Sequence, residues 1–196
     1  LIKELINRIE KTLGKQLEKT DDFTAIVNEK NFNRLVGLIN KNNLIYGGKY
    51  DKDKRYISPT IIDSPKMDEE IMKEEIFGPI LPVLSFEKIE DIDNIINKNP
   101  NPLALYVFSD NKKFNEIIIN RYPFGGGAIN DTIVHLANSR LPFGGIGSSG
   151  IGSYHGKASF ELFSHKKSVV KRSTWFDNNL RSVSYTHLTL PTIRTV

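Results

Sequence analysis

Nine of the fourteen glycines in this 196-residue chain fall between Gly125 and Gly156. Glycine has no Cβ, so it reaches positive φ and allows a second backbone or a ligand to come close. A flexible linker can have a similar composition, but Phe143, Ile146 and Tyr154 interrupt these glycines with apolar side chains that solvated linkers seldom carry. The stretch therefore predicts a shaped loop, and functional sites are commonly found on such loops when a rigid scaffold holds them.

The charge and the cysteine content exclude several classes of protein. The net charge is +4, but basic residues alternate with aspartates at residues 49–55, whereas nucleic-acid binding needs a one-sided basic surface. We therefore expect no nucleic-acid partner. The chain has no cysteine, so it offers no disulfides, no thiolate chemistry and no cysteine metal ligands. No apolar run reaches the ~18 residues of a membrane span and no signal peptide is recognisable, which favours a cytoplasmic protein.

Periodic apolar residues predict two helices near the start of the chain. Residues 1–13 place leucine and isoleucine on one helical face, and Gly14 ends the pattern. A second helix is predicted from Glu29 to Asn40, with Asn28 as its N-cap. Short strands and one short acidic helix are expected next, at residues 44–46, 55–57, 60–62 and 68–73 respectively.

The alternation of elements from residue 80 onward predicts the fold class. Apolar strands are expected at residues 80–86, 103–108 and 127–129, with one helix over residues 89–96 and another from Asp110. Strands separated by helices at this spacing indicate an α/β fold with a mostly parallel sheet, flanking helices and right-handed crossovers. The glycine-rich stretch follows the third strand, so we expect it at the carboxyl edge of the sheet, where ligands gather.

The chain divides into three expected regions. Residues 1–165 form the α/β domain and end with a short helix at residues 157–163. Residues 166–181 begin with an edge strand at residues 166–171. Residues 182–196 are rich in threonine and have no period, so we interpret them as a non-native tail.

A formal dinucleotide motif and the histidines are weak signals. Residues 145–150 match G-x-G-x-x-G, but Pro142 and further glycines flank the motif and no helix is predicted to begin there. We therefore do not interpret it as a dinucleotide fingerprint. His135, His155 and His165 lack metal-ligand spacing, and the chain has no cysteine to complete a set, so no metal site is expected.

The segment Glu74-Glu75-Ile76-Phe77-Gly78-Pro79 is the second informative motif. It can be the end of a helix followed by a turn. It can equally place a carboxylate that accepts hydrogen bonds from sugar hydroxyls beside an aromatic ring that packs on a heterocycle. Spacing alone leaves both interpretations open.

Taken in order, these motifs resemble the aldehyde dehydrogenase superfamily. The resemblance is carried by residues 74–79, by PLALYVF at residues 102–108, and by LPFGG at residues 141–145. The residues around Asn130, Asp131 and His135, together with residues 152–165, resemble the class three or fatty aldehyde dehydrogenase branch. The likeness extends over residues 1–181.

This resemblance implies an activity and a missing part. Members of the family oxidise aldehydes to carboxylic acids with NAD or NADP, using a cysteine nucleophile and a glutamate that activates water. The resemblance places both residues upstream of Leu1, where the chain opens inside a helix. It therefore implies a C-terminal fragment that holds no catalytic residue and is inactive on its own.

The resemblance also assigns roles to residues that are present. Glu75 would hold the nicotinamide ribose hydroxyls, and Phe77 would pack near the nicotinamide. Phe143 would line the aldehyde pocket, while Asn130 and His135 would support the loop of the nucleophile. The implied substrate is a medium- or long-chain aliphatic aldehyde or an aromatic one. The strand in residues 166–181 would pair across a homodimer, and membrane association of the longer parent is a second expectation for its location.

A different class of protein also fits the sequence. The chain can be a non-catalytic α/β module that binds or interacts, since a fold does not by itself determine a function. A cysteine and a glutamate in the upstream part of the gene would favour the enzyme.

Overall fold

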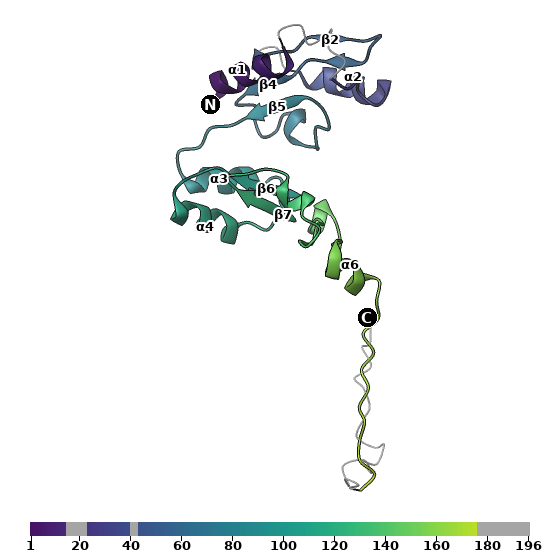
Figure 1. Ribbon diagram of the computed structural model, residues 1–196. Coiled ribbons are helices and arrows are strands. Elements are labelled where there is room, and N and C mark those ends of the chain that lie inside the picture. Colours follow the sequence, from purple (N-terminus) through teal and green to yellow (C-terminus); the bar gives the residue numbers. More distant parts are fainter. Residues whose placement is uncertain (15–22, 40–42, 176–196) are drawn as a thin grey trace, which may run out of the picture.

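The computed structural model describes residues 1–14, 23–39 and 43–175, in which helices alternate with short strands (Figure 1). The elements before residue 84 are α1 (Ile2–Leu13), α2 (Glu29–Leu38), β1 (Leu44–Tyr46), β2 (Tyr50–Asp51), β3 (Tyr56–Ile57), β4 (Thr60–Asp63), the 3-10 helix η2 (Glu70–Met72) and β5 (Ile80–Val83). The later elements are α3 (Ile89–Ile96), β6 (Ala104–Val107), α4 (Lys112–Arg121), β7 (Gly126–Ile129), α5 (Val134–Ala137), the 3-10 helix η3 (Gly147–Ser149) and α6 (Gly156–Leu162).

β4 is the central strand of the first sheet. It pairs antiparallel with β1 and parallel with β5, where Thr60 lies opposite Ile80. The side chains of Thr60, Ile61 and Ile62 are each at most 1% exposed, because strands and α2 surround them. The buried apolar residues that pack together here are Phe32, Leu35, Ile57, Ile62, Ile71 and Ile80.

The sheet arrangement differs from the single sheet predicted over residues 80–86, 103–108 and 127–129. β5 pairs with β4, whereas β6 pairs with β7 in a separate sheet. Pro82 gives a physical reason, since proline has no N–H to donate and is confined to edge strands. β5 accordingly lies at the edge of the order β1-β4-β5. The fold class itself, α/β with parallel strands and flanking helices, is confirmed.

The second sheet is a parallel pair of strands covered by helices. Ala104 of β6 lies opposite Gly126 of β7, and α4 connects the two strands. Figure 1 shows α3 and α4 beside this pair, below the first sheet in the view. Val107, Ile118 and Tyr122 are buried between the strands and the helices. The alternation of strand and helix predicted from residue 103 onward is therefore confirmed for β6, α4 and β7.

Asparagine side chains begin two of the predicted helices. The N–H of Asn31 donates to Oδ1 of Asn28 at 2.8 Å, as the predicted cap of α2 requires. The N–H of Phe114 donates to Oδ1 of Asn111 at 3.1 Å, so α4 begins just after Asp110, where a helix was expected. α2 ends at Leu38, before the predicted end at residue 40.

The chain beyond α6 runs away from both sheets as an extended segment (Figure 1). Residues 166–171 form no strand in the single chain, and Val169 and Val170 are 75% and 90% exposed. The predicted edge strand is therefore not seen here, because no strand among the described residues pairs with it. A strand that pairs across a dimer needs the second copy, so that pairing stays a prediction. The predicted tail at residues 182–196 lies outside the described residues.

In the described part of the chain, none of the helices combines the length and the apolar character that crossing a membrane requires.

Leu35 connects α2 to the turn before β5 and is fully buried. A Cβ added at Gly78 would lie 2.6 Å from Cδ1 of Leu35, so the helix and the turn are in close contact. We predict that Leu35→Ala lowers the free energy of unfolding by about 2–5 kcal/mol, because it leaves a cavity that the surroundings cannot fill. Urea unfolding of the chain measures this. Val27→Ala, at a side chain that is 77% exposed, should change stability by less than about 0.5 kcal/mol.

Asp93 joins α3 to the end of α4. Its carboxylate accepts from Nε of Arg121 at 2.7 Å and from the hydroxyl of Tyr122 at 2.8 Å. The hydrogen bonds from Arg121 and then Tyr122 lower the pKa of Asp93 below its ordinary value of 3.8.

A lowered carboxyl pKa gives a defined pH dependence of stability. The stabilisation is present above the pKa of the unfolded chain and is lost as the pH falls through the folded-state pKa. We predict that Asp93→Asn is less stable than the unmodified chain at neutral pH and that the two converge in acid below about pH 4. Thermal unfolding across pH 2–7 checks this. A difference in melting temperature that stays constant over this range would contradict it.

Candidate functional site

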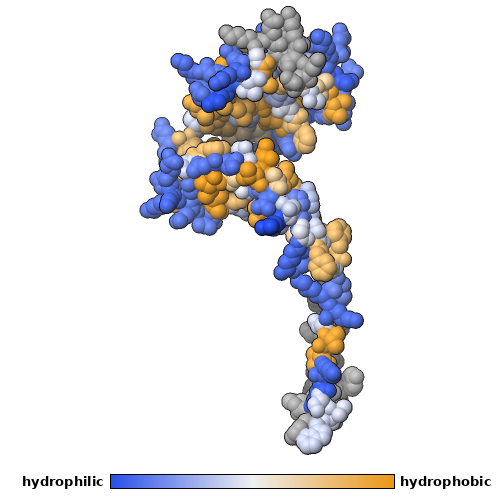
Figure 2. Space-filling view, viewed as in Figure 1, coloured by the Kyte–Doolittle hydropathy of each residue, from blue (hydrophilic) through white to orange (hydrophobic). Residues whose placement is uncertain are grey.

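A cavity with polar and apolar walls lies between the β1-β4-β5 sheet and the β6-β7 sheet. It has a volume of about 910 Å³, and Figure 2 shows apolar surface on both parts of the molecule that face it. One wall comes from the segment around η2, a second from the segment between α3 and β6, and a third from η3 in the glycine-rich stretch. The residues that line it are Ile71, Met72, Lys73, Glu74, Glu75, Ile76, Pro82, Lys98, Asn99, Pro100, Pro102, Leu103, Ala104, Ser148 and Ser149.

The turn at residues 73–79 is held from its inner side. The guanidinium of Arg34 in α2 donates to the carbonyl of Ile76 at 2.6 Å. Gly78 lies against Leu35, and the carbonyl of Pro79 accepts from the N–H of Thr60 at 2.8 Å. These contacts hold the backbone of the turn in one conformation, which fixes the positions of its exposed side chains.

Glu75 and Phe77 are exposed side chains of this turn, as are those of Lys73 and Glu74. Glu75, like Glu74, is one of the residues that line the cavity, and its carboxylate makes no hydrogen bond or ion pair with any described residue. Phe77 is 78% exposed and has a φ of 50°, a left-handed conformation that costs energy for a bulky residue. Strained backbone of this kind tends to occur at functional sites. A free carboxylate in a cavity next to an exposed ring is an arrangement that can accept hydroxyl hydrogen bonds and stack on a flat heterocycle.

His135 and Phe143 lie together, and neither lines the cavity. The ring centroid of His135 is 5.6 Å from that of Tyr106 in β6 and 5.9 Å from that of Phe143. Phe143 is half-buried, and its backbone forms a two-way bridge with Tyr154 at 2.9 Å in both directions. The glycine-rich stretch is thus folded back on itself, as the shaped-loop prediction expected.

His135 is 6% exposed, yet neither ring nitrogen has a hydrogen-bond partner among the described residues. A buried polar group without a partner is costly, so native proteins rarely leave one. The space that His135 occupies exists because Gly126 has no side chain, since a Cβ there would lie 2.7 Å from Cδ2 of the imidazole.

Asn130 follows β7 and is separate from the cavity. Its Oδ1 accepts from the N–H of Ser109 at 2.8 Å, and its Nδ2 donates to the carbonyl of Ser109 at 3.1 Å. With a φ of 57°, Asn130 ties the carboxyl end of β7 to that of β6. The structure therefore brings His135 to Phe143 and places Glu75 in the cavity, and it gives Asn130 a bracing contact between strands.

Lys98, Asn99, Ser148 and Ser149 line the cavity but were not candidates in the sequence. Their position depends on contacts between distant segments, and no local motif marks them. Two signals could have drawn attention to them: the prolines on either side of Asn101, and serines at the centre of a glycine-rich stretch.

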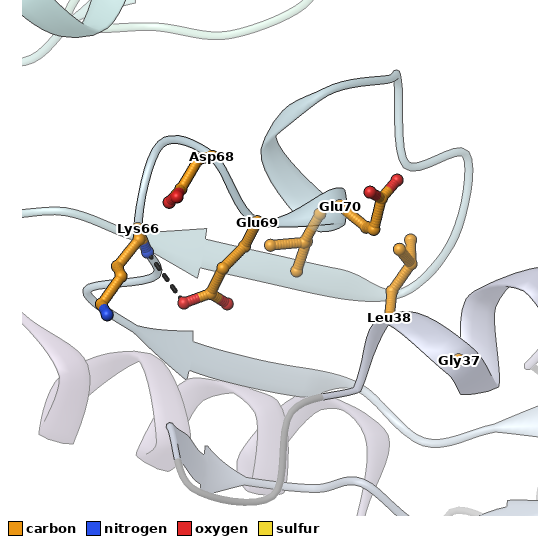
Figure 3. A pocket seen from close by; sticks show the side chains of 7 residues that line it. Gly37, Leu38, Lys66, Asp68, Glu69 and Glu70 are labelled. Atoms are coloured by element: carbon orange, nitrogen blue, oxygen red, sulfur yellow. Dashed lines mark hydrogen bonds between the residues drawn. The ribbon is translucent and has the colours of Figure 1, made fainter.

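A second cavity of about 540 Å³ lies between the end of α2 and η2. Figure 3 shows its acidic lining, with the N–H of Lys66 donating to a carboxylate oxygen of Glu69 at 3.1 Å. None of the residues predicted as site residues lines it, and the carboxylates of Glu69 and Glu70 are engaged locally by Lys66 and Lys73. We therefore assign the candidate site to the larger cavity.

The sequence profile of the aldehyde dehydrogenase family matches residues 1–169, and the chain belongs to this family. Among its relatives, 4,4'-diaponeurosporen-aldehyde dehydrogenase of Staphylococcus aureus is 45% identical over 188 residues, which is 93% of this chain and 41% of that protein. Aldehyde dehydrogenase family 3 member H1 of Arabidopsis thaliana is 42% identical over 94% of this chain and 39% of its own length. The chain thus spans about two fifths of the length of these relatives.

Solved structures agree with this assignment. The substrate-bound state of Staphylococcus aureus AldH has a TM-score of 0.85 and 43% identity over 95% of this chain and 41% of that one. The aldehyde dehydrogenase of Mycobacterium tuberculosis complexed with NAD+ has a TM-score of 0.68 and 28% identity over 79% of this chain and 33% of that one. The α/β fold seen here is therefore that of part of an aldehyde dehydrogenase.

The contact between Gly126 and His135 predicts that removal of the imidazole reduces the loss of stability caused by a substitution at Gly126. Gly126→Ala should lower the free energy of unfolding by about 1–3 kcal/mol, because its Cβ would overlap the buried imidazole. The same change should cost less in a His135→Ala background, where the overlap is gone. Denaturant unfolding of the four chains measures the difference.

Gly37→Ala is the matched control for this glycine change. Nothing lies within 4 Å of a Cβ at Gly37, and its helical position favours alanine, so this variant should be neutral or more stable. An equal penalty for Gly126→Ala with and without His135 would show that the imidazole is not the obstacle.

Proposed function

We propose that this chain is part of an enzyme that oxidises aldehydes to carboxylic acids with NAD or NADP. The observation that carries the proposal is the family match over residues 1–169, combined with the free carboxylate of Glu75 in a cavity of about 910 Å³. One relative, of Rattus norvegicus, is a dimeric NADP-preferring aldehyde dehydrogenase, and the M. tuberculosis structure contains NAD+, so the cofactor is proposed as either dinucleotide.

The overall reaction must balance. An aldehyde, the oxidised dinucleotide and one water give a carboxylate, the reduced dinucleotide and two protons. The C–H bond at the aldehyde carbon breaks, and its two electrons leave with the hydrogen as hydride, which the nicotinamide accepts. The family's route to this step begins with a cysteine thiolate, and these 196 residues contain none. The nucleophile must therefore come from outside this chain, and the chain alone should not turn over.

Glu75 is proposed to orient the cofactor. An ionised carboxylate is an acceptor with two oxygens, which matches the two neighbouring hydroxyls of a ribose. Because no described residue occupies these oxygens, they are free to accept. Phe77, with its exposed ring two residues further on, is proposed to pack near the nicotinamide. Together they would hold the flat ring so that the hydride has one direction of approach.

Phe143 and His135 are proposed to shape the aldehyde side. Phe143 stands in a cluster of aromatic rings in which it contacts His135 and Tyr154, and His135 in turn contacts Tyr106, so the cluster offers flat ring faces for apolar contact. Such a surface suits a medium- or long-chain aliphatic aldehyde or an aromatic one. Asn130 would support this side by holding the two strand ends together.

A homodimer is proposed for the parent protein. Residues 166–171 form no strand with any of the described residues, and Val169 and Val170 are exposed. An extended segment with open backbone groups can pair with a strand of a second copy. We propose residues 1–165 as part of the catalytic domain, residues 166–181 as this oligomerisation segment, and the cytoplasm as the location, with membrane association of the parent as a further possibility to test by fractionation.

Glu75→Gln in the longer enzyme that contains this chain tests the proposal. The amide keeps the size but replaces one acceptor oxygen with a donor, and hydrogen bonds to a charged group are worth about 1.5–3 kcal/mol. We expect kcat to fall roughly tenfold or more because the nicotinamide is less well oriented. Hydride transfer should then limit the rate, so a deuterated aldehyde should give a larger isotope effect than in the unmodified enzyme.

Glu116→Gln is the control, since it makes the same charge change on α4 away from the cavity. It should leave kcat and the isotope effect as they were. If Glu75→Gln behaves like Glu116→Gln, Glu75 is only part of a turn. If the unmodified longer enzyme forms no NADH or NADPH from any aldehyde, the chain belongs to a non-catalytic member of the family.

A further inference from the structure

Residues 98–102, here called the proline loop, form the wall of the cavity between α3 and β6. The sequence of this loop is Lys98-Asn99-Pro100-Asn101-Pro102. It is the place where the segment carrying Glu75 and the glycine-rich stretch carrying Phe143 are both contacted by the same few residues. The proposed function assigns it no role.

The first contact joins the proline loop to the cofactor side of the cavity. Nδ2 of Asn99 donates to the carbonyl of Met72 at 3.0 Å, across 27 positions of sequence. Met72 is the last residue of η2 and lies three positions before Glu75. The hydrogen bond therefore fixes the distance from the proline loop to the start of the turn that presents Glu75.

The second contact joins the proline loop to the glycine-rich stretch. Oγ of Ser148 donates to the carbonyl of Pro100 at 3.1 Å, across 48 positions of sequence. Beside it, Gly147 has a φ of 58°, and a Cβ there would lie 2.8 Å from Nδ2 of Asn101. Any other residue at Gly147 would be strained and would also meet Asn101, so the two loops depend on this close approach.

The proline loop is stiff between these two contacts. Pro100 and Pro102 each fix their own φ and restrict the residue before them. Asn101, between them, has a φ of 61°, which asparagine adopts more readily than most residues. The carbonyl of Pro102 accepts from the N–H of Gly125 at 3.0 Å, which anchors the loop to the start of β7. A segment that is restrained in this way transmits a displacement at one end to the other.

We propose that the proline loop is a rigid spacer that sets the width of the cavity between the turn of Glu75 and the wall formed by Ser148 and Ser149, with Asn99 and Ser148 as positioning residues for the hydride step. This inference rests on the proposed function. Neither Asn99 nor Ser148 is proposed to touch the reacting atoms. Each acts by holding one wall at the separation at which the cofactor and the aldehyde carbon meet.

The experiment uses the longer enzyme with Asn99→Ala, Ser148→Ala and the double variant. A single exposed hydrogen bond accounts for about a two- to tenfold change in rate or affinity. We expect each variant to lower the rate of hydride transfer by that factor and to increase the isotope effect with a deuterated aldehyde. Because both side chains hold the same loop, the double variant should lose less than the product of the two single losses.

Isosteric variants separate the hydrogen bond from the packing. Asn99→Asp replaces the donor with a carboxylate oxygen that faces the carbonyl of Met72, so it should be slower than Asn99→Ala. Ser148→Thr keeps the hydroxyl and should retain most of the activity. Asn111→Ala is the matched control, because it removes a side-chain bond to the backbone at the start of α4 and should lower the melting temperature without changing the isotope effect.

Two results would contradict the proposed role of the proline loop as a spacer. It is wrong if Asn99→Ala and Ser148→Ala behave like Asn111→Ala, lowering the melting temperature while hydride transfer and its isotope effect stay unchanged. It is also wrong if the losses in the double variant multiply fully, since two independent contacts would then be acting.

A second measurement needs no enzymatic activity and uses the 196-residue chain. The N–H groups of Met72 and Lys73 donate to the carbonyls of Glu69 and Glu70 within η2. Ser148→Ala should speed hydrogen exchange at these two amides, although Ser148 touches neither of them. Unchanged exchange there would overturn the spacer. An altered exchange in a protein that oxidises no aldehyde would refute the proposed function and leave the mechanical connection in place.

Discussion

The parallel pairing of β4 with β5 is the interaction on which the candidate site depends. The N–H of Thr60, on a strand that is buried on both faces, donates to the carbonyl of Pro79 at the end of the turn that carries Glu75 and Phe77. Oγ1 of Thr60 is satisfied as well, since it accepts from the N–H of Gly48 and donates to the carbonyl of Ser58. The N–H and the hydroxyl of Thr60 thus both have partners, which holds β4 in place. The hydrogen bond to Pro79 then fixes the position of the turn relative to β4.

The strength of the contacts falls from the sheets toward the cavity. The β1-β4-β5 and β6-β7 sheets are each backed by a cluster of buried apolar side chains, whereas the bond from Asn99 to Met72 that crosses between the two parts, and the bond from Ser148 to Pro100 beside it, are solvent-exposed side-chain bonds. Exposed bonds of this kind open more easily than a packed core. The separation of the cavity walls therefore depends on the stiff proline loop and its few side-chain contacts rather than on a packed core.

The sequence was most informative where a local rule decides the outcome. The cap at Asn28, the start of a helix near Asp110 and the shaped loop in the glycine-rich stretch follow from short-range chemistry, and the structure confirms them. The grouping of strands into sheets was predicted wrongly because the apolar run from residue 80 was weighed above the proline within it.

The site was only partly visible in the sequence. Glu75 and Phe143 stood out through family motifs, but the cavity lining from Asn99 and Ser148 arises from contacts across 27 and 48 positions. No periodicity or motif encodes such a separation. The close approach of His135 to Gly126 is likewise a tertiary event, since a glycine in a strand indicates a close neighbour without saying which one.

Pro82 has a consequence for the solubility of the folded chain. The carbonyls of Pro79 and Val83 point toward β4, so the backbone groups of Ile80 and Pro82 face the open edge of β5. The N–H of Ile80 already donates to the carbonyl of Gly78, and Pro82 has none. An intruding strand from another molecule would find no free donor along β5, so this edge resists the edge-to-edge stacking that leads to aggregation.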